Sequence, residues 1–314
     1  MVFAKDGRSI IVIGSTGTQG SSVIDSLSRS DKPYHVFAVT RDTSKPAAQK
    51  LQQEGVDLVQ ADVSTDRGVD DLFKQTGKDI DVLFGVTNFW EHLDKQKEIV
   101  DGKRLVDKAQ ANGVKLFIWS GLEGVQELTN GKIQHVEHFD SKHEVTKYAQ
   151  QSGLPTIVVQ AGFYASNFAT MMQPRKTENG IVFAYPFGPK TVISLVDTQA
   201  DYGKFVRAAL ENDKFCPGSE LLACAEELTI EDVVKQFNEG TFAIRAASYH
   251  QLPDQVFLDN AGHVGPEMLD MFRWFEQYGY YGGKDVKSSQ AAVSEPLTSW
   301  KEFVQKTDWS SVLA

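Results

Sequence analysis

The sequence has 314 residues, of which 41% are hydrophobic and 24% are charged, enough for one large domain or two coupled lobes. Its 42 acidic residues outnumber the 32 basic ones, and the net charge of −10 disfavours direct binding of nucleic acid, which depends on neutralising phosphates. Two cysteines, Cys216 and Cys224, are too few for a disulfide framework. The sequence has neither a run of about 18 apolar residues nor an apolar signal region. We therefore expect no membrane partner and a cytoplasmic location, with the nucleus as a second location.

Short apolar runs alternate with helical patterns through the first half of the chain. Buried strands are predicted at residues 9–14, 35–40, 57–60, 80–86, 115–120 and 156–160. Helical patterns fall at residues 17–30, 46–54, 92–112 and 138–151. This alternation predicts an α/β fold with a doubly wound parallel sheet, the Rossmann fold that binds NAD(P).

The alternation stops after Ala161. We expect residues 1–161 to form the Rossmann domain and residues 162–314 to form a smaller mixed α/β lobe that is interleaved with it. Within that lobe, residues 229–232 (TIED) predict a capped helix start. Residues 269–281 are rich in aromatics and predict a helix that packs on the sheet lobe.

A glycine-rich turn follows the first predicted strand, at residues 14–20 (GSTGTQG). Gly14 permits a sharp bend, Gly17 lets the backbone approach a pyrophosphate, and Gly20 lets helix and strand pack closely. The helix that follows offers free N–H groups to an anion. The turn and its context predict a dinucleotide site that includes Gly14, Ser15, Thr16, Gly17, Thr18 and Gln19.

The end of the second predicted strand indicates which dinucleotide binds. NAD sites place an acid there for the ribose 2′-hydroxyl, whereas this sequence has Arg41, followed by Asp42 and Lys45. A guanidinium can bind a 2′-phosphate through two hydrogen bonds. NADP(H) is therefore the predicted cofactor, and NAD(H) is the less favoured one.

Residues at the later strand ends extend this site. They are Asp62 and Val63 after the third strand, Thr87, Asn88 and Phe89 after the fourth, and Ser120 after the fifth. Ligands of open α/β sheets lie across these ends. Asp62 could accept a hydrogen bond from an adenine amine, and residues 87–88 could flank the nicotinamide ribose.

Catalytic residues of the short-chain dehydrogenase type are only partly present. That chemistry uses a serine after the fifth strand and a Tyr-x-x-x-Lys pair on the next helix. Ser120 and Lys142 occupy two of these positions, but His138 replaces the tyrosine. Histidine can donate a proton near neutral pH, although it more often has a structural role on a helix.

Two other kinds of site are disfavoured in the same stretch. A metal site built from His135, Glu137, His138, Asp140 and His143 lacks the i, i+4 spacing of paired histidine ligands, so no metal is expected. A hydrolase based on Ser141 and His143 lacks a G-x-S-x-G elbow.

Several of these segments together resemble the NmrA-like family, whose members are atypical short-chain dehydrogenases. The matching segments are GSTGTQG at residues 14–20, VTR ending at 41, TNFWE at 87–91, SGLE at 120–123, HFDSKHEV at 138–145, GFYASNF at 162–168 and MFRWF at 271–275. The resemblance extends over nearly the whole chain. It implies an NADP-binding protein of a family in which the catalytic tyrosine is often missing and members act as regulators.

The resemblance also implies which residues touch the cofactor. By motif, they are residues 14–19, Arg41, Lys45, Asp62, Val63, Thr87, Asn88, Phe89, Lys142, Tyr164, Ala165, Ser166 and Asn167. Two departures stand out. The loop after Arg41 is less basic than in related regulators, and the aromatic-to-Asn segment reads YASN.

Two functions follow as alternatives. The absent tyrosine favours a redox-sensing regulator that binds a protein such as a transcription factor, as a monomer or a homodimer. The other is an NADPH-dependent reductase of an apolar carbonyl, quinone or imine. An aromatic pocket built from Phe163, Tyr164, Phe168, Met171 and Met172 would favour the reductase, although these side chains would serve equally well as core.

Overall fold

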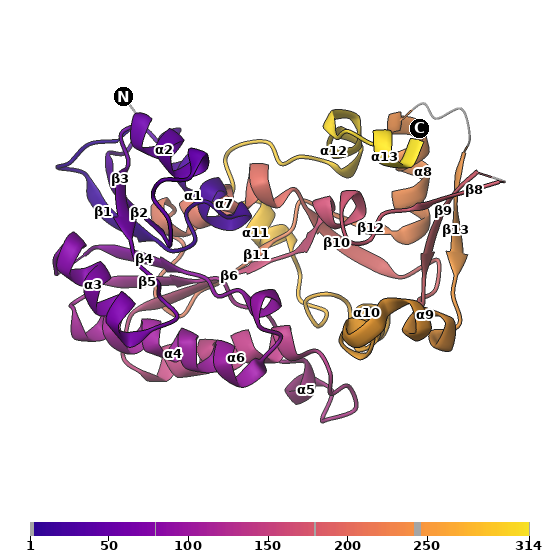
Figure 1. The fold of residues 1–314 in the computed structure, drawn as a ribbon, viewed down its shortest axis with the longest axis horizontal. Coiled ribbons are helices and arrows are strands. Elements are labelled where there is room, and N and C mark those ends of the chain that lie inside the picture. The colour runs from indigo at the N-terminus through magenta and orange to yellow at the C-terminus, as the bar shows by residue number, and fades with distance from the viewer. Residues whose placement is uncertain (1–2, 79, 179, 242–245, 314) are drawn as a thin grey trace.

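The computed structural model describes residues 3–78, 80–178, 180–241 and 246–313 (Figure 1). Its main feature is a seven-stranded parallel sheet with the strand order β11-β6-β5-β4-β1-β2-β3. The strands are β1 (Arg8–Val12), β2 (Tyr34–Thr40), β3 (Asp57–Gln60), β4 (Val82–Gly85), β5 (Leu116–Trp119), β6 (Thr156–Ala161) and β11 (Glu220–Ala223). The order reverses beside β1, so the predicted doubly wound sheet is confirmed.

Helices cover both faces of this sheet. They are α1 (Thr18–Ser28), α2 (Pro46–Gln53) and α7 (Thr198–Glu211) on one face, and α3 (Asp66–Thr76), α4 (Lys95–Ala111) and α6 (Glu137–Gln151) on the other (Figure 1). Alternate residues of β1 explain this arrangement. Ile10 and Val12 pack in the core with α1 and α7, whereas Ile11 packs in the core with α3, α4 and α6.

Helices α3 and α7 and strand β11 of the Rossmann lobe were absent from the sequence prediction. Helix α3 is capped by Thr65, whose hydroxyl accepts a hydrogen bond from the N–H of Gly68 at 3.0 Å. It buries Val69, Leu72 and Phe73, which have helical spacing. The seventh strand, β11, comes from beyond residue 162 and pairs in parallel with β6.

The interleaving of the chain also involves α7, which packs tightly on α1. At Gly203 a Cβ would lie 2.0 Å from the carbonyl oxygen of Ser22, so glycine is required for this approach. The N–H of Gly203 donates to the Ser22 hydroxyl at 2.9 Å. Both α7 and β11 are therefore parts of the Rossmann lobe supplied by the second half of the sequence.

The remaining strands and longer helices form a second lobe around two three-stranded sheets. One sheet has the order β12-β10-β7 and the other β13-β9-β8. Their strands are β7 (Phe163–Tyr164), β8 (Arg175–Thr177), β9 (Gly180–Tyr185), β10 (Val192–Val196), β12 (Glu226–Thr229) and β13 (Ala247–Gln251). The longer helices are α8 (Ile230–Thr241), α9 (Asp254–Ala261), α10 (Gly265–Tyr278) and α12 (Trp300–Lys306). Two short helices, η1 (Phe89–Glu91) and α5 (Val125–Leu128), follow β4 and β5 in the Rossmann lobe, and the other short helices are η2 (Ala165–Ala169), η3 (Gly262–Val264), α11 (Lys287–Gln290) and α13 (Ser310–Leu313).

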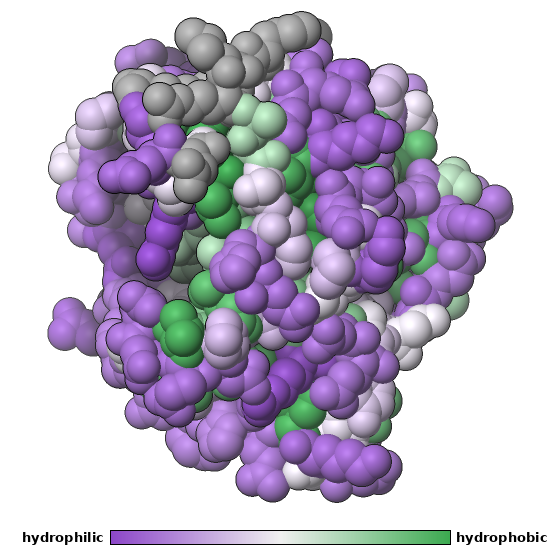
Figure 2. Space-filling view, turned by 90° about the vertical axis from the view of Figure 1, so that its right-hand side faces the viewer, coloured by the Kyte–Doolittle hydropathy of each residue, from purple (hydrophilic) through white to green (hydrophobic). Residues whose placement is uncertain are grey.

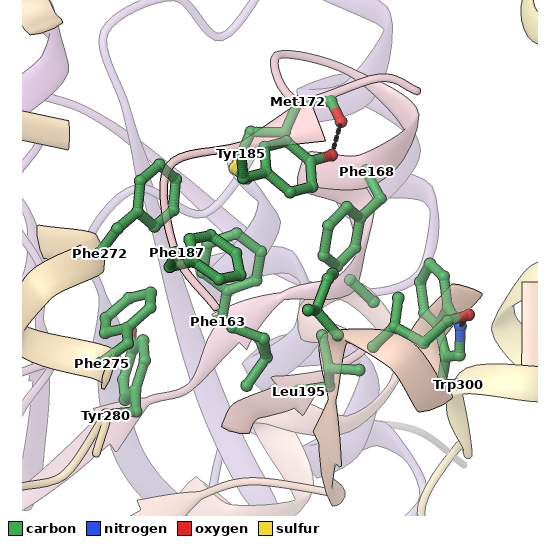
Figure 3. Close-up of a cluster of buried hydrophobic side chains, with 14 of the residues drawn as sticks. Phe163, Phe168, Met172, Tyr185, Phe187, Leu195, Phe272, Phe275, Tyr280 and Trp300 are labelled. Atoms are coloured by element: carbon green, nitrogen blue, oxygen red, sulfur yellow. Dashed lines mark hydrogen bonds between the residues drawn. The ribbon is translucent and has the colours of Figure 1, made fainter. Parts of the chain in front are cut away.

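An aromatic core holds this lobe together (Figure 3). Phe163 packs against Phe168 and Phe275, with ring centroids 5.5 and 5.9 Å apart, and Phe275 packs against Tyr280 at 4.9 Å. The prediction of a helix in residues 269–281 is confirmed by α10, but its expected packing on the sheet lobe was wrong, because its buried aromatic side chains belong to the core of the second lobe rather than to either face of the seven-stranded sheet. The predicted helix start is also confirmed, since the N–H of Asp232 donates to the Thr229 hydroxyl at 3.2 Å.

The outer end of the second lobe is mainly hydrophilic (Figure 2). On the face in view, hydrophobic residues show only in small areas between hydrophilic ones. Within the described part of the chain, no helix is long and apolar enough to cross a membrane.

Candidate functional site

The turn between β1 and α1 has the geometry of an anion cradle. Gly14 has a φ of +64°, which favours glycine, and a Cβ on Gly20 would lie 2.3 Å from the Gly14 carbonyl oxygen. Helix α1 begins after Gly17, and no described side chain caps its first turn. The N–H groups of that turn therefore remain open to a ligand.

A first cavity of about 490 Å³ runs from this turn along the carboxyl ends of β1 to β4. Most of the predicted cofactor residues line it. These are Gly14, Thr16, Gly17, Thr18, Gln19, Arg41, Asp62, Val63, Thr87, Asn88 and Tyr164. The structure thus brings together segments from four strand ends and from the second lobe.

The other predicted cofactor residues lie elsewhere. Phe89, Lys142 and Asn167 line a second cavity, described below. Ser15, Lys45, Ala165 and Ser166 are not among the residues that line either cavity. The Ser15 hydroxyl instead donates to the carbonyl of Val39 at 2.9 Å and ties the turn to β2.

Charged groups surround the predicted 2′-phosphate position. Arg41 is largely exposed, and its guanidinium forms an ion pair with the carboxylate of Glu91 at the end of η1. This hydrogen bond lowers the pKa of Glu91. Asp62 accepts hydrogen bonds from the hydroxyl and N–H of Ser64 at 2.8 and 3.1 Å, and the hydroxyl contact in particular lowers its pKa. Both carboxylates are therefore ionised at neutral pH.

The second cavity, of about 270 Å³, adjoins the first. Gln19, Val86, Thr87, Asn88 and Tyr164 line both. The rest of its wall is largely aromatic or methionine, with Phe89, Trp90, Phe139, Phe163, Met171, Met268, Met271 and Tyr280. Of the five residues expected to form an aromatic pocket, Phe163, Tyr164 and Met171 line this cavity, whereas Phe168 and Met172 belong to the hydrophobic core.

A polar contact marks the junction of the cavities. The Gln19 side-chain nitrogen donates to the Tyr164 hydroxyl at 2.7 Å. Burial raises the pKa of Tyr164, so its phenol stays protonated. The Gln19 carbonyl oxygen is buried and has no hydrogen-bond partner among the described residues.

Lys142 lines the second cavity but is held by protein atoms. Its ammonium donates to the carbonyl and hydroxyl oxygens of Thr87, each at 3.1 Å, and pairs with the carboxylate of Glu98. The other Glu98 oxygen accepts a hydrogen bond from Ser141. An ammonium group has three protons, so these three acceptors can use all of them. Glu98 was not predicted as a site residue, and its signal in the sequence is an acidic residue on the face of α4 that is buried.

His138 also lines the second cavity, and its ring is paired with a carboxylate from the other lobe. Nδ1 lies against Glu267 of α10, and that carboxylate also accepts the N–H groups of Glu137 at 2.9 Å and of His138 at 3.1 Å. A carboxylate only accepts hydrogen bonds, so Nδ1 carries a proton. No described residue provides a hydrogen-bond partner for Nε2.

A second acidic residue of α10, Asp270, binds the backbone just before α6. Asp270 accepts hydrogen bonds from the N–H groups of Gln134 and His135, and its carboxylate lies 2.8 Å from Nδ1 of His135. Glu267 and Asp270, which we call the acidic clasp, thus bind the start of α6 in place of a local cap. His135 and His138 therefore have separate carboxylate partners.

Ser120 is buried and lines the second cavity below the end of β5. Its N–H donates to the carbonyl of Gly85 at 3.0 Å. The three residues predicted for catalysis, Ser120, His138 and Lys142, therefore share one cavity wall.

A doubly wound sheet with a glycine cradle, open to a cavity across its strand ends, is the architecture of dinucleotide-binding proteins. The model of the NmrA-like family matches residues 6–304. The chain belongs to the NmrA-like family.

The chain is similar to several proteins along its whole length. The NmrA-like family domain-containing oxidoreductase ptmS of Penicillium ochrochloron is 27% identical over 97% of this chain and 96% of the relative. The crystal structure of NmrA, a negative transcriptional regulator, in complex with NADP has a TM-score of 0.79 at 21% identity, with 96% of each chain covered. Triphenylmethane reductase of a Citrobacter species, complexed with NADP(H), has a TM-score of 0.74 at 17% identity, covering 95% of this chain and 98% of that one.

Proposed function

We propose that the chain is an NADP(H)-dependent reductase of an apolar carbonyl, quinone or imine. One observation carries the proposal: an aromatic cavity with a carboxylate-paired histidine opens beside the cavity at the strand ends. The two share Thr87 and Asn88, which lie where a nicotinamide ribose is expected. Apolar lining with a few polar groups is typical of small-molecule sites. The oxidoreductase and reductase names of similar proteins agree with this function.

The residues of the first cavity fit a dinucleotide. A pyrophosphate would lie on the open N–H groups at the start of α1, where side chains at Gly14 or Gly20 would obstruct the turn. Arg41 would bind the 2′-phosphate of NADP(H). NmrA has been solved with NADP and with NAD, so this fold accommodates either form, and Arg41 favours the phosphorylated one.

When bound, a reduced nicotinamide supplies a hydride. The chain would supply the proton that neutralises the reduced oxygen or nitrogen of the substrate. His138 would fill this role as an imidazolium: Glu267 accepts a hydrogen bond from Nδ1, and the proton on Nε2, on the opposite side of the ring, would pass to the substrate. Met171, Met268 and the surrounding aromatic rings would bind the apolar body of the substrate and exclude water.

A redox-sensing regulator is the second candidate. Two observations favour it: histidine replaces the tyrosine at position 138, and Lys142 is bound to Glu98 and Thr87 rather than left open to a ribose. The similarity to a negative transcriptional regulator agrees with this function, which would require a protein partner.

One experiment separates these functions. The purified chain is titrated calorimetrically with NADPH, NADP⁺, NADH and NAD⁺, and NADPH oxidation is then followed with quinones, aldehydes and imines. Turnover of a substrate supports the reductase. Tight NADP(H) binding without turnover across the panel contradicts the reductase and supports the regulator.

A further inference from the structure

Arg41, the predicted ligand of a 2′-phosphate, already has an anionic partner. Its guanidinium is paired with Glu91, and both side chains line the first cavity. The exposed fractions are 66% for the Arg41 side chain and 34% for Glu91, so the pair is open to an incoming ligand. A phosphate on the ribose would therefore meet a cation whose charge a carboxylate already balances.

The neighbouring charges strengthen this competition. Asp62 lies close enough to act electrostatically on both Arg41 and Glu91. His92 acts on Glu91 with the opposite sign when protonated. Lys97 is the other cation that acts on Asp62. Its Nζ lies 2.6 Å from a carboxylate oxygen of Asp101, so Lys97 is already paired. Arg41 is therefore the cation at this corner whose present partner a ligand could replace.

The two dinucleotides differ in how they meet Glu91. A 2′-phosphate carries a charge of about −1.5 to −2 at neutral pH, so it repels the carboxylate and competes with it for Arg41. A ribose 2′-hydroxyl is neutral and can donate a hydrogen bond to an acid. Glu91 should therefore oppose the binding of NADP(H) and leave NAD(H) binding unimpaired.

We propose that Glu91 is a specificity-determining residue, whose carboxylate occupies Arg41 in the absence of a 2′-phosphate and lowers the preference of the site for NADP(H) over NAD(H). This inference rests on the proposed dinucleotide site in the first cavity. It assigns opposite effects to two residues of one ion pair: Arg41 raises the preference for the phosphorylated form, and Glu91 reduces it.

The position of Glu91 connects its ion pair with Arg41 to the wall of the second cavity. Glu91 ends η1, and the two preceding residues, Phe89 and Trp90, form part of that cavity's wall. Release of Glu91 from Arg41 would remove the described ion pair that ties this short helix to the end of β2.

The test is calorimetric titration of the full chain with NADP⁺ and NAD⁺, and with the 2′- and 5′-phosphates of adenosine as probes of the phosphate position. Glu91→Gln should tighten NADP⁺ binding about fivefold, leave NAD⁺ binding within about twofold, and tighten adenosine 2′-phosphate but not the 5′-phosphate. Glu127→Gln removes an exposed carboxylate from a comparable pair with Lys147, away from both cavities, and should change none of these affinities. Thermal unfolding of each variant checks that it is folded.

A double-mutant cycle isolates the pair. In an Arg41→Ala background, Glu91→Gln should give a smaller gain in NADP⁺ affinity, because no guanidinium is released. An unchanged or lower NADP⁺ to NAD⁺ preference in Glu91→Gln would overturn the inference while leaving the proposed function intact. Failure of the wild-type chain to bind either dinucleotide would overturn both.

Discussion

At the scale of single residues, two carboxylates determine which protons are available to the second cavity. Glu98 forms an ion pair with Lys142, and together with two oxygens of Thr87 it provides an acceptor for each proton of the ammonium group. Glu267 is hydrogen-bonded to Nδ1 of His138, whereas Nε2 has no partner among the described residues. The two nitrogen-bearing side chains predicted for catalysis thus differ in their partners: the acceptors around Lys142 can use all of its protons, whereas one ring nitrogen of His138 has no described partner.

The first prediction concerns His138. Replacement by glutamine removes the proton donor but keeps a polar side chain, so the kcat of NADPH oxidation should fall about 100-fold, with little change in NADPH affinity. Steady-state kinetics with a substrate from the screen, together with calorimetry, measure both quantities. His143→Gln, on the same helix but outside both cavities, should keep normal kcat. Wild-type kcat in His138→Gln would remove His138 from the mechanism.

The second prediction concerns Glu98, which is 4% exposed. Glu98→Gln leaves the buried Lys142 ammonium without a counter-ion, so the free energy of unfolding should fall by about 3 kcal/mol. Glu144→Gln, in an exposed pair with Lys147, should cost at most about 1 kcal/mol. Urea denaturation gives the values. Because the two sites interact, Glu98→Gln combined with Lys142→Met should cost less than the sum of the single changes, and simple additivity would contradict the pairing.

At the scale of elements, the acidic clasp joins α10 to the start of α6. Glu267 and Asp270 accept hydrogen bonds from the backbone of residues 134, 135, 137 and 138, which lack a local cap. The second lobe therefore completes the start of α6, the helix that carries His138 and Lys142.

The third prediction is a pH dependence at this contact. Burial alone would raise the pKa of Asp270, but hydrogen bonds from His135 and Gln134 outweigh it and hold the pKa below its ordinary value. The ionised carboxylate stabilises the fold above the unfolded pKa of about 3.9, and this stabilisation is lost as pH falls through the lower folded value. Asp270→Asn should cost about 1 kcal/mol near pH 7.

Unfolding free energies measured from pH 7 to pH 3 provide the check. The difference between wild type and Asp270→Asn should be constant above about pH 5 and shrink below about pH 4. Asp213→Asn, which removes an exposed carboxylate, should follow the wild-type curve. A difference that grows on acidification would show that Asp270 is not stabilising as an anion.

Local patterns were sufficient to predict much of this architecture. The six buried strands, the glycine turn and the capped start of α8 follow from neighbouring residues, and all are present. Helix α3 was missed because its apolar face is short, although Val69, Leu72 and Phe73 carry the signal. Strand β11 was missed because its sequence, ELLA, has no β-branched or aromatic residue, in contrast to the equally short β3, β4 and β5. Glu98, Glu267 and Glu91 were missed because their roles depend on contacts between segments distant in the sequence, as the pairing of Glu267 with His138 illustrates.

At the scale of the whole molecule, the two lobes are not successive segments of the chain. The sheet that begins at β1 is completed by β11, and α1 is covered by α7, although both partners follow residue 162. A fragment that ends at Ala161 would expose one edge of β6 and the apolar face of α1.

The fourth prediction follows. Residues 1–161 expressed alone should show no cooperative thermal transition, because the fragment lacks the strand and helix that cover this edge and face. Circular dichroism and calorimetry make the comparison with the full chain. A monomeric fragment with a sharp transition would mean that β11 and α7 are dispensable for the Rossmann lobe.

Because β11 follows β6 by many residues in the sequence, the pairing of these two strands is delayed during synthesis of the chain. Strand β6 ends at Ala161 and β11 ends at Ala223, so the ribosome adds about 60 residues between the two, which takes about 3–12 s at about 5–20 residues per second. During that interval the unpaired backbone N–H and C=O groups at this edge of β6 are available to other nascent chains. Slower translation of this stretch would lengthen the exposure, so the yield of folded protein should depend on the codons that encode it.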